Sequence, residues 1–379
     1  MQILAGPASG QRLRVRFTGS GSEYFRIWIV NLLLTIVTLG FYYPWAKARR
    51  LAYFHGNTEV DGDALAFLGD PRKMLRGYLL VVLAWLLYLL ASRLSPPLAA
   101  GIGVLFVLAW PALWRASLQF RLANTSWRGV RMQFVGPLAG AYRACVPLLP
   151  PLVLFAVGLA LAPAGEEQTA PEGADLVIAL LPLIAMLLMA ALLPLWLAGA
   201  RRYQHNHMVW GGEHSRLSVG TRAFYAWGAR VLGLVLLVGL AVAALGFAWA
   251  RGIGGPPAVV FSLSFVLLYL LMFIVVWPYA VARLQDLTWR HTASEHLQFC
   301  SALGARALMR RTALNLLFTV FTLGFYRPFA AVATARLRLE AVSLVFHGDE
   351  AEWRSRLAER VDDATGDFAG DFFGIDLGF

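Results

Sequence analysis

Six long apolar runs constrain this chain more than any other feature of its sequence. Each run is long enough, or nearly so, to cross about 30 Å of hydrocarbon as a helix that rises 1.5 Å per residue. The runs are Leu75–Ala91, Leu98–Trp114, Val146–Ala162, Leu176–Gly199, Val231–Ala250 and Ala258–Val281. Short turns join consecutive runs in pairs, which predicts three helical hairpins in a membrane.

The composition agrees with a membrane protein. Of the 379 residues, 59% are hydrophobic and only 15% are charged, whereas a soluble domain carries about 25% charged residues. The two cysteines, Cys145 and Cys300, are too few for a disulfide-rich secreted scaffold. Residues 1–17 lack the apolar core of a signal peptide, so none is expected.

The basic residues are divided unevenly between the two ends of the hairpins. Four long linkers hold 21 of them, and the short turns hold two, Arg93 and Arg251. The linkers are 47–77, 115–145, 200–230 and 282–312. Because Lys and Arg are retained on the cytoplasmic side, this predicts a membrane protein whose linkers are cytoplasmic. The net charge of +11 follows this topology, so we expect no nucleic-acid partner.

Two further apolar segments are copies of each other. Residues 31–46 read NLLLTIVTLGFYYPWA and residues 315–330 read NLLFTVFTLGFYRPFA, with eleven of sixteen positions identical, which indicates an internal duplication. A Thr-Leu-Gly break followed by a proline lies in each copy. A single crossing would place basic residues of both termini outside. We therefore predict two re-entrant hairpins beside six spanning helices; the alternative is eight spanning helices.

The linkers also repeat a pattern. Alternating apolar residues at Leu13–Phe17, Ala64–Phe67 and Val130–Phe134 predict short strands, and Asp61-Gly62 and Arg128-Gly129 predict turns between strands. The repeated residues are Asn57-Thr58, Gly62 and Phe67-Leu68-Gly69, matched at the same spacings by Asn124-Thr125, Gly129 and Phe134-Val135-Gly136. Since such strands are unstable singly, we expect a cytoplasmic β-layer beneath the helices.

The predicted fold is therefore an all-α polytopic membrane protein, built from internal repeats, with short β-strands from the cytoplasmic linkers. Residues 1–350 are expected to form a single integral membrane domain. Residues 351–379 form an acidic tail rich in Gly and Phe, which we expect to be cytoplasmic and disordered. The expected partner is the lipid bilayer, with a homo-oligomer or a cytoplasmic protein partner left open.

Three stretches carry a resemblance to a known family. The run TLGFYYPWAKARR at Thr38–Arg50, the linker HGNTEVDGDALAFLG at His55–Gly69 and the opening FTGSGSEYF at Phe17–Phe25 resemble the YjgN family of bacterial inner-membrane proteins. The resemblance implies a polytopic inner-membrane protein. The family is defined as a domain of unknown function, so it implies no reaction, ligand or catalytic residue. Arg327 replaces the aromatic residue found at Tyr43 in the other copy.

No group of residues predicts catalysis or metal binding. His205, His207 and His214 have ligand types at a compact spacing, but only Glu213 lies near them in the sequence and no Cys-x-x-Cys pair is present. Neither a Gly-x-Ser-x-Gly elbow nor a phosphate-binding Walker loop occurs. We therefore expect no catalytic residue, no metal site, no cofactor and no enzymatic activity.

The polar residues expected in the membrane lie in the duplicated segments. They are Asn31, Thr35, Thr38, Tyr42, Asn315, Thr319, Thr322, Tyr326 and Arg327. One interpretation is hydrogen bonding between helices. The other is a polar path, as broken helices provide in channels and transporters. Four further arginines are expected to anchor helix ends at the inner interface, namely Arg49, Arg115, Arg201 and Arg283.

These features predict a channel or transporter-like protein for a small solute or ion, with its path between the duplicated hairpins. The alternative is a non-transporting membrane scaffold that binds a cytoplasmic partner.

Overall fold

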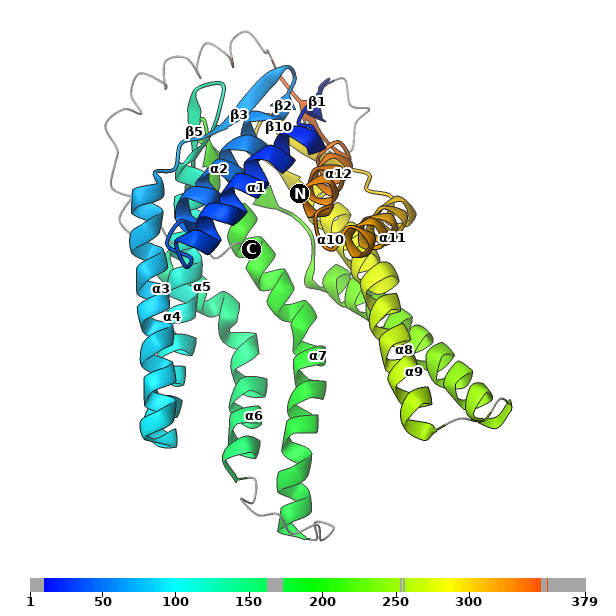
Figure 1. The fold of residues 1–379 in the computed structure, drawn as a ribbon. Coiled ribbons are helices and arrows are strands. Elements are labelled where there is room, and N and C mark those ends of the chain that lie inside the picture. The colour runs from blue at the N-terminus through cyan, green and yellow to red at the C-terminus, as the bar shows by residue number, and fades with distance from the viewer. Residues whose placement is uncertain (1–9, 162–172, 253, 255, 349–352, 354–379) are drawn as a thin grey trace.

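The computed structural model describes residues 10–161, 173–252, 254, 256–348 and 353. The acidic turn expected at Pro163–Asp175 lies outside the described residues except for 173–175, as does all of the expected tail except Trp353. Long helices project from one side of a strand layer and form three separate legs (Figure 1). We call the strand layer's side of the molecule the sheet side.

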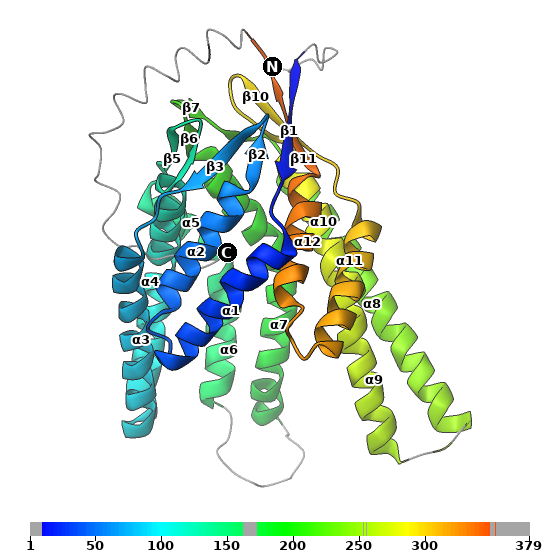
Figure 2. The same ribbon diagram turned by 45° about the horizontal axis from the view of Figure 1, so that its top comes forward.

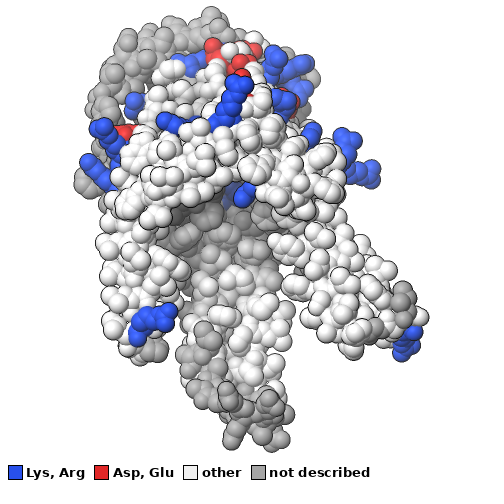
Figure 3. Space-filling view, viewed as in Figure 1, with Lys and Arg blue, Asp and Glu red and all other residues white. Residues whose placement is uncertain are grey.

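The three predicted membrane hairpins are confirmed. Within the described residues, six helical stretches are long and apolar enough to span a membrane. These stretches are Pro71–Leu94, Pro97–Ala123, Leu138–Gly158, Leu176–Asn206, Thr221–Gly252 and Pro257–Trp289. Their elements are α3 (Pro71–Leu94), α4 (Pro96–Ala123), α5 (Leu138–Cys145), η1 (Val146–Leu148), α6 (Leu149–Leu161), α7 (Ala174–Asn206), α8 (Thr221–Gly252), α9 (Pro257–Leu271), the π-helix η2 (Met272–Val276) and α10 (Trp277–Trp289). Charged side chains gather on the sheet side and leave most of the legs bare (Figure 3).

Each duplicated segment folds as two helices joined by a tight turn. The first copy forms α1 (Gly21–Val37) and α2 (Tyr43–Gly56), and the second forms α11 (Ala305–Phe321) and α12 (Arg327–Leu339). Leu39 and Leu323 both have φ of 50°, in the left-handed region that bulky residues rarely adopt. The amide of the following glycine donates to a carbonyl five residues earlier, at 2.8 Å in one copy and 2.7 Å in the other, which closes the helix end in a Schellman motif.

Both duplicated hairpins return to the sheet from which they leave. Strand β1 (Gln11–Phe17) precedes α1 and pairs antiparallel with β2 (Thr58–Val60), which follows α2. Strand β10 (Leu297–Ser301) precedes α11 and pairs in the same way with β11 (Val342–Phe346), which follows α12. Because paired strands lie side by side, the chain enters and leaves each hairpin on the same side of the molecule.

The strand layer is far larger than the short β-strands that the sequence predicted, so a purely all-α description is incomplete. Eleven strands form one sheet in the order β7-β6-β5-β4-β3-β2-β1-β11-β10-β9-β8. The remaining strands are β3 (Asp63–Phe67), β4 (Thr125–Trp127), β5 (Val130–Phe134), β6 (Met208–Trp210), β7 (Glu213–His214), β8 (Arg216–Leu217) and β9 (Thr292–Ala293). Only Ser215 separates the two end strands, β7 and β8, in the chain. The sheet therefore curls into a nearly closed barrel, which we call the strand ring (Figure 2).

Local sequence explains how each linker becomes a hairpin of the ring. The predicted turns at Asp61-Gly62 and Arg128-Gly129 are confirmed, with φ of 55° and 87° in the first and 52° and 78° in the second. Positive φ at both central residues is the geometry that matches the twist of paired strands. Gly211 and Gly212 repeat it, with φ of 56° and 78°. Three of the four linkers can therefore reverse tightly and send the chain back towards the membrane.

The repeated Phe-x-Gly sequence has a packing reason. A Cβ on Gly136 would lie 2.6 Å from the ring of Phe134 and 2.8 Å from the hydroxyl of Tyr203, and a Cβ on Gly69 would lie 2.4 Å from the ring of Phe67. The phenylalanine ring thus folds over the glycine that ends each strand. This contact holds the start of the next helix close to the strand ring.

The two duplicated hairpins also pack against each other. The rings of Phe25 and Phe329 lie 5.7 Å apart, and those of Trp28 and Phe325 lie 6.5 Å apart edge to face. Gly21 permits this approach, because a Cβ there would lie 2.4 Å from Phe329. Helices α1 and α12 consequently lie side by side beneath the ring (Figures 1 and 2).

Candidate binding cavities

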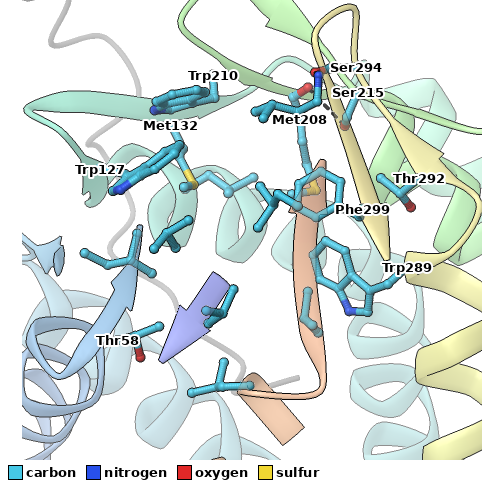
Figure 4. A pocket seen from close by; sticks show the side chains of 18 of the residues that line it. Thr58, Trp127, Met132, Met208, Trp210, Ser215, Trp289, Thr292, Ser294 and Phe299 are labelled. Carbon is cyan, nitrogen blue, oxygen red and sulfur yellow. Dashed lines mark hydrogen bonds between the residues drawn. The ribbon is translucent and has the colours of Figure 1, made fainter. Parts of the chain in front are cut away.

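The strand ring encloses a cavity of about 530 Å³, which we call the ring cavity. Its wall is mostly apolar, and residues from both halves of the chain point into it, among them Trp127, Met132, Trp289 and Phe299 (Figure 4). Alternate residues of β10 and β11 line it, Leu297 and Phe299 on the one and Val342 and Leu344 on the other, as expected for side chains that share one face of a strand. The cavity has the size and character of a small-molecule site.

One polar corner interrupts this wall. Glu213 on β7 accepts hydrogen bonds from the Ser294 hydroxyl at 2.7 Å and from Nδ1 of His296 at 2.9 Å, an ion pair when the imidazole is protonated. Burial alone would raise the pKa of Glu213, but hydrogen bonds from Ser294, Trp353 and the His296 backbone, with the His296 charge, bring its pKa below the ordinary value. Glu213 is therefore held as a carboxylate.

Trp353 closes over the aromatic end of the ring cavity. Its ring lies 5.2 Å from that of Trp210 and 4.8 Å from that of Phe346, and only 3% of the residue is exposed. Its indole nitrogen donates to Glu213 at 2.9 Å. A side chain from near the end of the chain thus completes the core of the ring.

A second cavity of about 680 Å³ lies between helices α2, α11 and α12 and the junction of η2 with α10; we call it the arginine groove. Three arginines line it, Arg50, Arg327 and Arg338. Phe273 and Trp277 form an aromatic wall, and they are 41% and 64% exposed. Trp277 lies four residues before the end of the apolar run Ala258–Val281, and tryptophan near the end of such a run is typical of the interface between hydrocarbon and water.

Arg338 and Ala335 on α12 line both cavities. The Arg338 guanidinium donates to Oε1 of Gln285 at 3.0 Å, and Nε2 of Gln285 donates back to the Arg338 carbonyl at 2.9 Å. Among the described residues, neither Arg338 nor nearby Arg201 forms an ion pair. The junction between the cavities therefore carries a positive charge that no carboxylate of the described chain neutralises.

Part of the set of residues predicted to form a polar path lines the arginine groove. Asn315, Thr319 and Arg327 of the second copy line the arginine groove. Asn31, at the position of Asn315, is buried in the first copy, and the Oδ1 atoms of both asparagines lack a hydrogen-bond partner within the described chain. Arg327 faces the groove, whereas Tyr43, at the equivalent position, packs 5.5 Å from the ring of Tyr78 on α3.

The four threonine hydroxyls of the predicted path bond to their own helices. Thr35 and Thr319 each donate to the carbonyl four residues earlier, at 2.6 Å in both copies. Thr38 and Thr322 donate in the same way at 2.7 Å, and they accept from the amides of Tyr42 and Tyr326 at 3.0 and 2.9 Å. Their hydroxyl groups thus fasten the two helix ends across the break.

The four predicted anchor arginines lie on the sheet side and make different contacts. Arg115 donates to the Gly136 carbonyl at 2.7 Å, and Arg201 donates to Oε1 of Gln204 at 2.8 Å. Arg49 and Arg283 each lie over a tyrosine of their own helix, at 5.7 and 5.6 Å from the ring centres of Tyr42 and Tyr279.

The histidines of the compact sequence cluster point to different partners. Nδ1 of His205 lies 3.1 Å from the Thr292 hydroxyl, and Nδ1 of His207 lies 2.9 Å from the Tyr203 carbonyl. Within the described residues, no group of three or more His, Cys, Asp or Glu side chains is placed to hold a metal ion.

Sequence reasoning missed Arg50 and Arg338 as cavity residues, because Arg50 was counted only in the basic bias of the linkers and Arg338 only among the basic residues of the C-terminal part. The spacing of α12 offered a signal. Arg327, Ala331, Thr334, Ala335 and Arg338 recur at three or four residues and so share one helical face.

Comparison with known proteins gives family similarity without an activity. A family described as "Bacterial protein of unknown function (DUF898)" matches residues 12–372. The inner membrane protein YjgN of Escherichia coli K12 is 31% identical over 144 residues, which are 38% of this chain and 35% of that protein. YjgN of Salmonella typhimurium LT2 is 29% identical over 147 residues, 37% of this chain and 36% of that protein. The chain thus spans about a third of the length of the curated relatives it matches. No solved structure matches the chain.

Proposed function

Since the chain belongs to the DUF898 family of bacterial proteins of unknown function, we propose its function from its own geometry: it is a transporter-like membrane protein that moves a small amphipathic solute between the bilayer and the ring cavity. The route passes through the arginine groove. The observation that carries this proposal is that Ala335 and Arg338 line both cavities, so that the groove and the ring cavity meet on one face of α12.

The chemistry of the two cavities supports an amphipathic solute over a bare ion. The ring cavity is walled mainly by tryptophan, methionine and aliphatic side chains, which offer an ion few polar ligands. The arginine groove offers guanidinium groups beside the aromatic side chains of Phe273 and Trp277. A solute with an apolar body and a polar head would find both parts satisfied along this route.

The proposal also assigns an orientation. The strand ring faces the cytoplasm, because the linkers that form it hold 21 basic residues, and basic residues are retained on that side. The duplicated hairpins enter the cytoplasmic leaflet and return. Their turns expose leucine, with Leu39 91% and Leu323 90% accessible, which favours contact with hydrocarbon over water.

A flux assay with two variants of one residue tests the route. Liposomes that contain the wild-type protein should take up members of a panel of fluorescent amphipathic solutes faster than protein-free liposomes. Ala335→Phe should abolish the excess flux, because the larger ring fills the junction of the cavities. Ala335→Ser is the matched control, since it leaves the junction open, and should keep the flux. Equal flux through both variants would contradict the route.

Trp353 supports a second candidate function, a scaffold that binds a cytoplasmic partner. The ring already accepts a tryptophan side chain between Trp210 and Phe346, which shows that its end fits an aromatic peptide residue. Two results together would favour the scaffold over the transporter. One is the absence of flux for every solute, and the other is a protein that copurifies only with a Trp353→Ala variant, in which the ring end is open.

A further inference from the structure

One face of α12 forms the floor of the arginine groove. Its side chains are small in the middle of the helix and basic at both ends. Arg327 and Arg338 lie eleven residues apart, which is about 16 Å along a helix axis. Between them the groove is lined by Ala330, Ala331, Thr334 and Ala335. These short side chains leave the groove open, and Arg50 on α2 also contributes to its lining.

The charge of this groove is one-sided. No Asp or Glu occurs among the described residues that line it, and none of its three arginines forms an ion pair there. Arg50, Arg327 and Arg338 are all exposed, so their charges act on the space of the groove. Positive groups gathered in a cleft without a carboxylate attract anions. The groove therefore favours an anionic ligand.

The duplication supplies an independent indication. In the first copy, Tyr43 packs on α3, so no charged residue occupies this helical position. In the second copy the equivalent residue is Arg327, which lines the arginine groove. The two copies thus differ at this position: an aromatic contact in the first stands where a groove-lining charge stands in the second.

The aromatic wall indicates that the ligand reaches the groove from the bilayer. Phe273 belongs to the π-helix η2, and Trp277 begins the α-helix that follows. A π-helical insertion is rare and often marks a functional site. Because both side chains are accessible at the membrane end of the groove, an apolar chain can lie against them while a charged head reaches the arginines.

From this combination we propose that the arginine groove binds the phosphate headgroup of an anionic phospholipid of the cytoplasmic leaflet. The assignment rests on the proposed function, of which it names the substrate class. Guanidinium groups bind phosphate oxygens through paired hydrogen bonds. Basic pockets between membrane helices on the cytoplasmic side are suited to anionic headgroups. The volume of about 680 Å³ holds the headgroup and the adjoining part of the chains.

Two charge-matched triple variants test the assignment. Binding of fluorescent phosphatidylglycerol is measured by titration of the full-length protein in a neutral detergent. Arg50→Gln/Arg327→Gln/Arg338→Gln removes the groove charges. Arg76→Gln/Arg222→Gln/Arg306→Gln is the control, since it removes three exposed sheet-side charges that do not line the groove. We expect the groove triple to bind about tenfold more weakly or worse, and the control to bind within about twofold of wild type.

Competition identifies the source of the phosphate. Unlabelled phosphatidylglycerol should displace the probe, whereas phosphatidylcholine and inorganic phosphate should not do so at the same concentration. Displacement by inorganic phosphate would assign the groove to a soluble phosphate, and displacement by phosphatidylcholine would show that charge is not recognised; either result overturns the proposal. Equal weakening in both triple variants would overturn it as well, and thermal unfolding of both variants verifies that they are folded.

The same preparation separates this inference from the proposed function. Selective binding of phosphatidylglycerol without excess flux in liposomes would refute transport and retain the ligand class. Flux that depends on Ala335 but shows no preference for anionic amphiphiles would retain transport and refute the ligand class.

Discussion

The indole nitrogen of Trp353 donates a 2.9 Å hydrogen bond to the carboxylate of Glu213, 140 residues earlier in the chain. The bond joins a residue beyond the last strand to β7, one of the two end strands of the ring. Ser294 and His296, next to β10, bond to the same carboxylate. Glu213 therefore links three parts of the chain beside the gap between β7 and β8, the two end strands of the sheet.

Removing this carboxylate should destabilise the ring. Glu213→Gln keeps the shape but places an amide among groups that donate hydrogen bonds to it, so we expect a loss of about 1–3 kcal/mol. Thermal unfolding in detergent measures the change. Glu295→Gln is the control, because Glu295 lies nearby but is exposed. An equal effect of both changes would show that the carboxylate contacts contribute nothing specific.

The stabilisation by Glu213 should also depend on pH in one direction. Because the folded pKa lies below the ordinary value, the contribution is complete above the unfolded pKa of about 4.3 and is lost as the pH falls through the folded pKa. The difference in melting temperature between wild type and Glu213→Gln should therefore shrink as the pH falls below about 4. A difference that grows as the pH falls below about 4 would contradict this sign.

Gly136→Ala tests the Phe-x-Gly contact. The added Cβ would meet both Phe134 and the Tyr203 hydroxyl, which itself donates to the Pro137 carbonyl at 3.0 Å and cannot move freely. We expect a loss of about 1–3 kcal/mol in thermal unfolding. Gly101→Ala, where no atom lies within 4 Å, should be neutral or stabilising. Phe134→Leu should recover part of the loss in the Gly136→Ala background, since the two side chains are in contact.

The turns of the duplicated hairpins should lie in hydrocarbon. In a protein whose two cysteines are replaced by serine, Leu39→Cys carrying a polarity-sensitive fluorophore should emit at short wavelength and be quenched by brominated lipids. The same label at Asp63→Cys, an exposed position on β3, should report water and resist quenching. Identical spectra at the two positions would place the turn outside the bilayer.

Both ends of the chain should be cytoplasmic, because each duplicated hairpin returns to the ring. A reporter that is active only in the cytoplasm should give signal when fused before Met1 and when fused after Phe379. In the cysteine-free protein, Gln168→Cys should react with an impermeant maleimide in cells with a permeable outer envelope, whereas Ser215→Cys should not. Two silent fusions, or the reverse labelling pattern, would contradict the orientation.

The sequence predicted the elements of this fold better than their assembly. Six apolar runs were long enough to be recognised as spans. Gly62 and Gly129 marked tight turns, because glycine adopts the positive φ that these turns require. These are local signals. Closure of the ring depends on pairings such as Gln11 with Phe346, which are 335 residues apart and leave no periodic trace in either strand.

The binding cavities were harder to predict for a related reason. Asn315 and Thr319 were singled out because they are polar residues in an apolar segment, a pattern visible in one helix. Arg338 was not, because a basic residue near a membrane helix is ordinary until the fold shows that no carboxylate accompanies it. The ring cavity collects side chains from strands throughout the chain, so no single stretch predicts it.

The closeness of β7 and β8 in the chain has a mechanical consequence. A sheet whose last strand is joined to its first by one residue behaves as a hoop: it offers a second molecule only two-residue edges on β7 and β8, too short for strand addition. Self-association would have to use helical surfaces. Each membrane leg is also fixed to the hoop at both of its sheet-side ends, so the hoop sets the spacing of the three legs on that side.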